Sequence, residues 1–358
     1  MSDLIWLRAE TKAMEARSAL TPGLVRELLN SGKEVVVERS SQRAIDDSSF
    51  AETGCTMIDE GTWLTAPKHA YILGLKELPE DNTPLAHRHI YFAHAYKNQH
   101  GWQDLLRRFN EGGGELFDLE YLVDETDRRV AAFGYWAGFA GCAVSLKIWA
   151  GQQLGNNPVI STLVPYSDKD ALIEDIRAEV TAAIDAAKCS PRLIVIGALG
   201  RVGQGAVQLA QELGLSVTQW DMKETLPGGP FAEIPEHDIF INCVLVQKKI
   251  PPFVTTDSLA HEDRNLSVIC DVSCDPGEYN PIPLYSEATT FSAPIHKVIE
   301  GDNPLYLSAI DHLPSLLPVE ASEDFGQQLL PHLLSLSGER SDVWQRALTL
   351  FNQKSTFL

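Results

Sequence analysis

Short apolar runs alternate with helix-like segments in the first third of the chain. Leu24, Val25 and Leu28 lie on one face of a helix that begins at Pro22, and Gly32 can end that helix. Another helix is predicted over residues 102–109. Buried strands are predicted at residues 4–7, 34–38, 70–75, 90–93 and 116–119. Strands that alternate with helices in this way are typical of an α/β domain.

The alternation continues beyond residue 133. It predicts helices over residues 133–151 and 168–187, and strands at residues 193–196, 216–220, 239–243 and 268–272. Two more helices are predicted at residues 325–334 and 344–351, and Pro331 is expected to kink or interrupt the first of them. We expect one domain over residues 1–132, completed by residues 318–358, and a second domain over residues 133–317.

Three glycines follow the strand at residues 193–196. Gly197, Gly200 and Gly203 are spaced GxxGxxG rather than GxGxxG, and a helical pattern comes next. Such a turn brings backbone N–H groups and a helix N-terminus to the phosphates of a dinucleotide. Asp221, at the end of the following strand, is placed to bind the adenosine ribose, and its charge favours NAD over NADP. The alternative is an ordinary strand–turn–helix. No Lys-Ser/Thr pair follows the glycines, which excludes a P-loop.

Charge and cysteine content narrow the class of protein. The formal net charge of −20 argues against nucleic acid or an anionic membrane as a partner, so an anionic substrate would need local arginines. The uncharged stretch 130–146 contains Gly134, Gly138 and Gly141 and is expected to be a buried helix rather than a membrane span. The six cysteines have no disulfide-framework spacing, and no signal peptide is recognised, so a cytoplasmic location is expected.

Two titratable residues follow neighbouring predicted strands. Lys76 comes after residues 70–75, and His94 comes after residues 90–93. Because parallel strands end at the same edge of a sheet, both side chains would face one crevice, where they could transfer protons during oxidation of an amine or alcohol. The alternative is that each is a solvated strand-end residue. Cys270 and Cys274 have no partner ligands nearby, so no metal site is predicted.

The motifs as a set resemble the saccharopine dehydrogenases (NAD, L-lysine-forming), which catalyse the final step of the α-aminoadipate route to lysine. More distantly, this family is similar to the alanine dehydrogenases and transhydrogenases. The resemblance implies an α/β fold of two Rossmann-like domains with parallel sheets around a central cleft, and a monomer. It is carried, from end to end and in order, by residues 7–22, 72–80, 91–102, 127–141, 195–205, 220–225, 238–243, 271–276 and 310–318.

The resemblance also implies roles for individual residues. Lys76 would take the proton from the secondary amine of saccharopine, and His94 would assist hydrolysis of the imine to lysine and 2-oxoglutarate. Glu77 and Glu120 would tune the proton affinities of these two bases. The substrate would be bound by Arg17, Lys76, Gln99, Arg129, Phe133, Ser273, Cys274 and Asp275. NAD would be held by Arg128, Gly197, Gly200, Arg201, Gly203, Asp221, Thr225, Val272, Ile310, Asp311, His312 and Leu313.

Two other functions remain open at this point. One is a related opine or amino acid dehydrogenase that uses a different amino donor. The other is a protein that binds NAD without catalysing a reaction. The presence of both Lys76 and His94 argues against this second alternative. The dependence of NADH oxidation on the amino donor separates these possibilities.

Overall fold

A computed structural model describes residues 3–96, 100–246, 248–261, 263–336 and 342–356. The chain divides into two compact units, one made of Met1–Ala132 with Pro318–Leu358 and the other of Phe133–Leu317. Each unit has its own six-stranded sheet. We call them unit 1 and unit 2. The α/β prediction is therefore confirmed.

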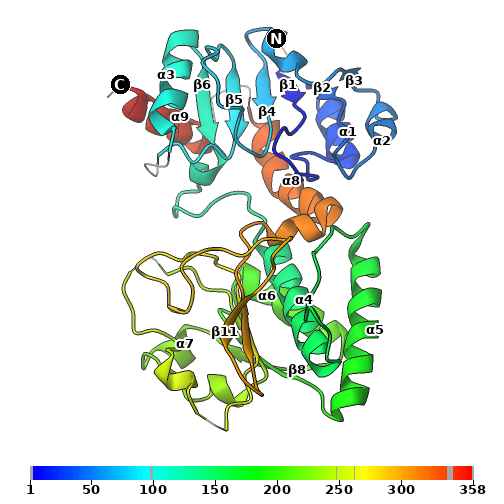
Figure 1. Ribbon diagram of the computed structural model, residues 1–358. Coiled ribbons are helices and arrows are strands. Elements are labelled where there is room, and N and C mark those ends of the chain that lie inside the picture. Colours follow the sequence, from blue (N-terminus) through cyan, green and yellow to red (C-terminus); the bar gives the residue numbers. More distant parts are fainter. Residues whose placement is uncertain (1–2, 97–99, 247, 262, 337–341, 357–358) are drawn as a thin grey trace. The chain divides into compact units, whose positions relative to one another are not determined.

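The sheet of unit 1 is parallel in all of its strand pairings. Its order is β3-β2-β1-β4-β5-β6 (Figure 1), so the chain moves outward from β1 to one edge and then from β4 to the other. At a change of direction such as that between β1 and β4, the carboxyl ends of the strands form a ligand crevice in open parallel sheets. The strands are β1 Leu4–Leu7, β2 Glu34–Glu38, β3 Thr56–Ile58, β4 Tyr71–Leu73, β5 Arg88–Tyr91 and β6 Glu115–Asp118.

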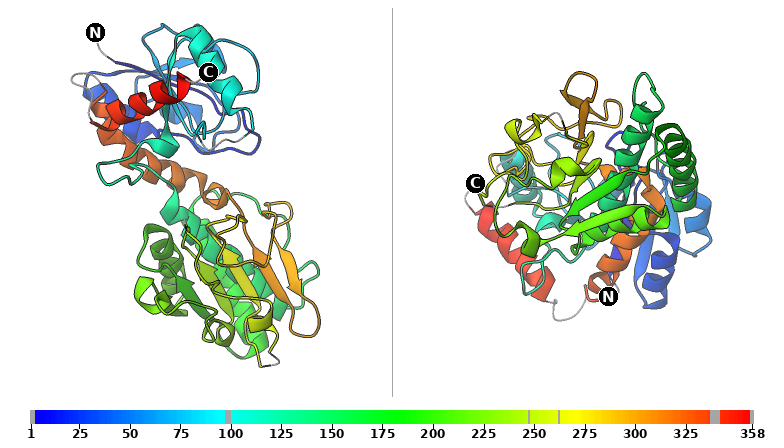
Figure 2. Two further views of the ribbon diagram at one scale, coloured as in Figure 1. Left: turned by 90° about the vertical axis from the view of Figure 1, so that its left-hand side faces the viewer. Right: turned by 90° about the horizontal axis from the view of Figure 1, so that it is seen from below.

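The helices of unit 1 come from both ends of the sequence. The C-terminal helices α8 and α9 return to this unit (Figures 1 and 2), where α8 packs on α1 and α9 packs on α3 and β6. Trp344 of α9 meets Phe117 of β6 edge to face, with ring centroids 5.5 Å apart. The elements are α1 Pro22–Asn30, α2 Asp47–Ala51, α3 Trp102–Gly112, α8 Pro318–Leu334 and α9 Asp342–Ser355, with short 3-10 turns η1 Thr62–Thr65 and η2 Leu119–Tyr121.

The sheet of unit 2 has the order β11-β12-β10-β9-β7-β8, in which only the edge strand β11 is antiparallel to its neighbour. Its strands are β7 Arg192–Ile196, β8 Ser216–Trp220, β9 Ile239–Asn242, β10 Val268–Asp271, β11 His296–Ile299 and β12 Leu305–Ser308. Its helices are α4 Gly134–Gln153, α5 Lys169–Ala187, α6 Arg201–Glu212 and α7 Met222–Thr225, with turns η3 Ile234–Glu236, η4 Asp257–Leu259 and η5 Leu313–Leu316.

Helix α4 lies inside unit 2, where it packs on the helices α5 and α6 and on the strands β9 and β10 (Figure 1). A Cβ added to Gly138 would lie 1.7 Å from the carbonyl oxygen of Val202, and one added to Gly205 would lie 1.9 Å from that of Tyr135. Glycine at both positions therefore lets α4 and α6 approach backbone to backbone. In the described part of the chain, no helix combines the length and apolar character that crossing a membrane requires.

Several details differ from the sequence predictions, and α8 and β5 are two examples. Helix α8 continues through Pro331 to Leu334, so this proline does not interrupt the helix, although it has no N–H to donate to the carbonyl four residues earlier. The strand predicted at residues 90–93 is observed at Arg88–Tyr91. Phe92 still pairs with Leu75, but the N–H of Ala93 turns away from the sheet to the carboxylate of Asp118.

Candidate active site

Lys76 and His94 follow two adjacent parallel strands of unit 1. Strand β4 ends at Leu73 and its neighbour β5 ends at Tyr91, so both loops leave the same edge of the sheet. The side chains of Lys76 and His94 are partly buried. The structure therefore brings these two predicted residues to the same edge of one sheet, which is where ligands meet open parallel sheets.

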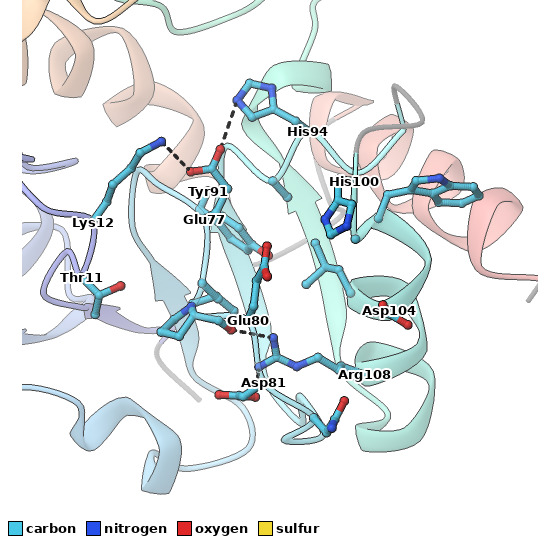
Figure 3. Close-up of a pocket in the computed structure, with 17 residues that line it drawn as sticks. Thr11, Lys12, Glu77, Glu80, Asp81, Tyr91, His94, His100, Asp104 and Arg108 are labelled. Atoms are coloured by element: carbon cyan, nitrogen blue, oxygen red, sulfur yellow. Dashed lines mark hydrogen bonds and ion pairs between the residues drawn. The ribbon is translucent and has the colours of Figure 1, made fainter. Parts of the chain in front are cut away.

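Glu77 connects His94 to a lysine that the sequence did not single out. Its carboxylate lies 3.9 Å from His94 Nε2 and 3.5 Å from Lys12 Nζ, as Figure 3 shows. Exposed ion pairs of this kind contribute less than about 1 kcal/mol to stability. The significance of Glu77 is therefore electrostatic, because it places negative charge beside two groups that can carry positive charge.

A cavity of about 720 Å³ opens beside His94 and Glu77 (Figure 3). Its walls come from the segment after β4, from the end of β5 and from α3. Tyr91 lines the cavity, and its buried hydroxyl has no hydrogen-bond partner among the described residues. Arg108 braces one wall, since its guanidinium contacts Asp81 at 2.7 Å and donates to the carbonyl of Pro79 at 3.0 Å. Charges of both signs line the cavity, which suits a zwitterionic ligand.

Arg17 forms a buried two-point ion pair with Glu15. Arg17 Nε donates to Oε1 at 2.8 Å and Nη2 donates to Oε2 at 2.6 Å. Burial alone would raise the pKa of Glu15, but the hydrogen bonds and charge of Arg17, together with the charge of Lys76, hold that pKa below its usual value. Sequence reasoning missed Glu15, although its position two residues before Arg17 was a signal that could have been used.

The other arginines predicted in unit 1 are also paired with acids. Arg129 lies 2.8 Å from Glu120, and the exposed Arg128 lies 3.5 Å from Asp124. Glu120 is thus placed to neutralise a predicted substrate-binding arginine. Gln99, which was also predicted to bind substrate, lies outside the described residues.

The glycine turn of unit 2 has the backbone that a dinucleotide site needs. Gly197 directly follows β7 with φ of +84°, and Gly200 is the N-cap of α6. A Cβ on Gly203 would lie 2.1 Å from the carbonyl oxygen of Gly197, so only glycine allows α6 to start this close to β7. Among the described residues no side chain caps α6 at its N-cap Gly200, so the N–H groups of its first turn can meet an anion. These residues fit NAD.

Asp221 stands between β8 and α7 and contacts the glycine turn. One oxygen of its carboxylate accepts the Leu199 N–H at 3.0 Å, and the other accepts the Met222 N–H at 2.8 Å. A carboxylate can accept further hydrogen bonds at each oxygen, so the group retains capacity for ribose hydroxyls. The predicted Thr225 lies in the same short helix, where its hydroxyl donates to the Asp221 carbonyl.

A buried carboxylate that the sequence did not reveal lies at the ends of β9 and β10. Asp271 accepts hydrogen bonds from the Asn242 amide at 3.0 Å, the Ser273 hydroxyl at 2.6 Å and the Tyr285 hydroxyl at 2.7 Å. Burial raises the pKa of Asp271 even though these hydrogen bonds act in the opposite direction. The network holds the start of the predicted substrate-binding stretch, since Ser273 is part of it.

The remaining predicted residues of unit 2 range from buried to exposed. Phe133 is the N-cap of α4, and Cys274 has φ of +48° with its thiol directed to the Ala309 carbonyl at 3.2 Å. The ring of His312 lies 4.4 Å from that of Phe291. Phe133, Val272, Ser273, Cys274 and His312 are partly buried, Ile310 and Leu313 are buried, and Asp275, Arg201 and Asp311 are exposed. Arg129 of unit 1 is also exposed. In the described part of the chain, no group of three or more His, Cys, Asp or Glu residues is arranged to hold a metal ion.

Comparisons with known proteins identify the family. A family model described as the alanine dehydrogenase/PNT N-terminal domain matches residues 6–140. A saccharopine dehydrogenase [NAD(+), L-lysine-forming] from Emericella nidulans is 52% identical over 99% of this chain and 97% of its own. One from Yarrowia lipolytica is 49% identical over 97% of this chain and 96% of its own.

Solved structures agree on the fold. An L-alanine dehydrogenase superposes with a TM-score of 0.66 over 97% of this chain and 93% of its own, at 17% identity. At that identity the likeness concerns the fold alone, whereas the sequence matches extend along the whole chain. The resemblance seen in the sequence motifs is confirmed, and the chain belongs to the saccharopine dehydrogenase (NAD, L-lysine-forming) family.

Proposed function

We propose that this chain catalyses the NAD-dependent, reversible oxidative cleavage of saccharopine. Saccharopine, NAD⁺ and water give lysine, 2-oxoglutarate, NADH and a proton. The observation that carries the proposal is the 52% identity to a saccharopine dehydrogenase over 99% of the chain, which includes both units. The reaction is the last step of lysine formation through α-aminoadipate.

Unit 2 is proposed to bind the cofactor. The turn of Gly197, Gly200 and Gly203 would receive the pyrophosphate at the start of α6, and Asp221 would accept hydrogen bonds from the adenosine ribose. When bound, NAD⁺ supplies a hydride acceptor. The proposed contacts elsewhere are made by Arg128, Arg201, Thr225, Val272, Ile310, Asp311, His312 and Leu313.

Two residues of unit 1, Lys76 and His94, are proposed to transfer the protons of the reaction. Lys76 takes the proton from the secondary amine as the carbon beside it is oxidised, which leaves an imine in the substrate. His94 then accepts a proton from the water that attacks this imine, and the carbinolamine collapses to lysine and the ketone of 2-oxoglutarate. Two bases suit a reaction that transfers protons more than once. Glu77 lies 3.9 Å from His94, which supports its proposed role in tuning that base.

Local positive charge is proposed to bind the carboxylates of the substrate. Saccharopine carries three carboxylates, and the net charge of −20 gives the chain no general attraction for them. Arg17 and Arg129 are the proposed partners, each already held by an acid, Glu15 or Glu120. An arginine fixed in this way presents its remaining N–H donors in one orientation. Further substrate contacts are proposed for Gln99, Phe133, Ser273, Cys274 and Asp275.

The decisive experiment measures NADH oxidation by the purified chain with 2-oxoglutarate and a series of amines. The proposal expects loss of NADH absorbance with lysine, and much slower loss with ornithine, alanine or glutamate. Faster turnover with another amine would indicate a related opine or amino acid dehydrogenase. NADH binding without turnover on any amine would indicate a non-catalytic NAD-binding protein.

Two properties of the whole molecule complete the proposal. We propose a cytoplasmic location, which is supported by the state of the cysteines: all six are free thiols. We also propose a monomer, as the family resemblance implies. Sedimentation at several concentrations, with and without NADH, tests the second point.

A further inference from the structure

We propose that two buried carboxylates, Asp118 and Glu10, are positioning residues that hold the loops of His94 and Lys76 in their working conformations. The inference rests on the proposed function in so far as it calls these loops catalytic. Asp118 ends β6, the strand beside β5, and Glu10 follows β1, the strand beside β4. Each acid therefore comes from the strand adjacent to the one that carries its base.

Asp118 binds the backbone on both sides of His94. Its Oδ1 accepts the Ala93 N–H at 3.1 Å, and its Oδ2 accepts the Ala95 N–H at 3.0 Å. Oδ1 also accepts the Glu120 N–H at 3.0 Å, so the same carboxylate fixes the turn that carries Glu120. The Asp118 side chain is 1% exposed, which means that water does not compete for these hydrogen bonds.

The backbone conformation of His94 explains why its loop needs a buried carboxylate as a hydrogen-bond acceptor. His94 has φ of +51°, in the left-handed region that residues with a Cβ rarely occupy. Alternation of right- and left-handed residues turns successive N–H groups toward one point and makes an anion-binding nest. The N–H groups of Ala93 and Ala95 converge on Asp118 in this manner. The anion that occupies the nest of His94 is therefore part of the chain itself.

Glu10 serves the loop of Lys76 in a similar way. Its Oε1 accepts the Leu75 N–H at 2.7 Å, and its Oε2 accepts the Lys76 N–H at 2.9 Å. Arg8 contacts Glu10 at 3.3 Å and also donates to the carbonyl oxygen of Lys76. A Cβ on Gly74 would lie 2.4 Å from Arg8 Nε, so glycine at this position makes room for the guanidinium. The peptide groups on both sides of the Lys76 Cα are thereby fixed.

The test uses Asp118→Asn, which keeps the shape of the side chain but turns an amide nitrogen toward one of the N–H donors. We expect kcat for NADH oxidation with lysine and 2-oxoglutarate to fall about tenfold to a hundredfold, because small displacements of a catalytic group have effects of this size. The Kd of NADH, measured by fluorescence, is expected to stay within about twofold of the native value. Asp118→Ser is the second variant, should the asparagine variant not fold.

A double-mutant cycle separates positioning from a general loss of structure. Asp118→Asn is expected to cost little further kcat in a His94→Gln background, since the positioned group is already absent. Equal losses in both backgrounds would overturn the assignment of Asp118. The same cycle for Glu10→Gln uses a Lys76→Met background. Glu38→Gln is the control for Asp118, because Glu38 is also a buried acid that accepts backbone N–H groups, and those of Ala9, Gly61 and Trp63 lie outside the loop of His94.

Hydrogen–deuterium exchange provides a readout that does not depend on activity. Asp118→Asn is expected to speed exchange at the amides of Ala93 and Ala95, while Glu38→Gln leaves them unchanged. Unchanged exchange at both amides in Asp118→Asn would overturn the proposal even if the native enzyme is active. A native chain that lacks activity on every amine would instead refute the proposed function, and the exchange data would still decide whether Asp118 holds this loop.

Discussion

Arg17 and Glu15 form a two-point ion pair in which the side chains are only 4% and 3% exposed. A guanidinium so enclosed has a fixed orientation, and its partner offsets part of its charge. An arginine that binds a substrate carboxylate from such a pair has little freedom to lose on binding. The pair would therefore connect the packing of the loop after β1 with the proposed recognition of an anionic substrate.

Arg17→Lys should raise the KM for 2-oxoglutarate roughly tenfold, since lysine keeps the charge but cannot make the two parallel hydrogen bonds to Glu15 or to a carboxylate. Initial rates at varied 2-oxoglutarate measure the effect. Arg26→Lys is the matched control, because Arg26 is an exposed residue of α1 in the same unit. An unchanged KM in Arg17→Lys would remove Arg17 from the substrate site.

Lys76→Met and His94→Gln should each lower kcat by about 10²-fold or more, as expected when a general acid–base group is lost. NADH binding should hardly change, because both residues lie in unit 1 and the proposed NAD contacts of the glycine turn lie in unit 2. Fluorescence titration with NADH beside steady-state rates makes the comparison. A large loss of NADH affinity with normal kcat would contradict their assignment as proton carriers.

Asp221→Ala should weaken NADH binding roughly tenfold, because the proposed hydrogen bonds to the ribose are lost. It should also reduce the preference for NADH over NADPH, because the repulsion between the carboxylate and a 2′-phosphate is removed. The variant also deprives the Leu199 N–H of its acceptor. Asp221→Asn is the control for that loss, since an amide oxygen can still accept this hydrogen bond without the charge. If both variants keep the native cofactor preference, the ribose contact is wrongly assigned.

Sequence patterns predicted those parts of the fold that depend on local periodicity. Strands β1 and β8 and the glycine turn after β7 lie where the patterns indicated. The strands β3, β11 and β12 were missed. β3 and β11 are edge strands without a fully buried residue, so the sequence carries no buried apolar run at either position. Their place in the sheets depends on pairing with distant strands.

The residues of the candidate site likewise fall into two groups, those that the sequence predicts and those that it does not. Lys76 and His94 could be found from the sequence because each directly follows an apolar run. Glu10 and Asp118 could not, since their roles arise from hydrogen bonds to residues 65 and 25 positions away. An acid near a strand end looks the same in a sequence whether it is solvated or bound to a buried loop. Only the strand order places these acids beside the bases.

His89 should make unit 1 less stable in acid. The ring is completely buried, and both ring nitrogens lack hydrogen-bond partners among the described residues. Burial lowers the pKa of His89 well below 6.5, and the nearby charges of Arg8, His87 and Arg108 act in the same direction. Below pH 6.5 the imidazole of His89 binds a proton in the unfolded chain, whereas it stays neutral in the folded chain. The free energy of unfolding therefore falls as the pH drops through this value.

His89→Phe should reduce this acid sensitivity, because phenylalanine keeps an aromatic ring against Trp63 and Phe109 and binds no proton. Between pH 8 and pH 5.5, the free energy of unfolding is expected to fall by about 1.4 kcal/mol less in His89→Phe than in the native chain. This gain is the free energy of protonating an ordinary histidine one pH unit below its pKa. Thermal unfolding at the two pH values measures the gain. His69→Gln, at an exposed position, serves as the control and should leave the difference between the two pH values as in the native chain. If His89→Phe loses as much stability in acid as the native chain, the ring of His89 is protonated in the folded state and the burial argument fails.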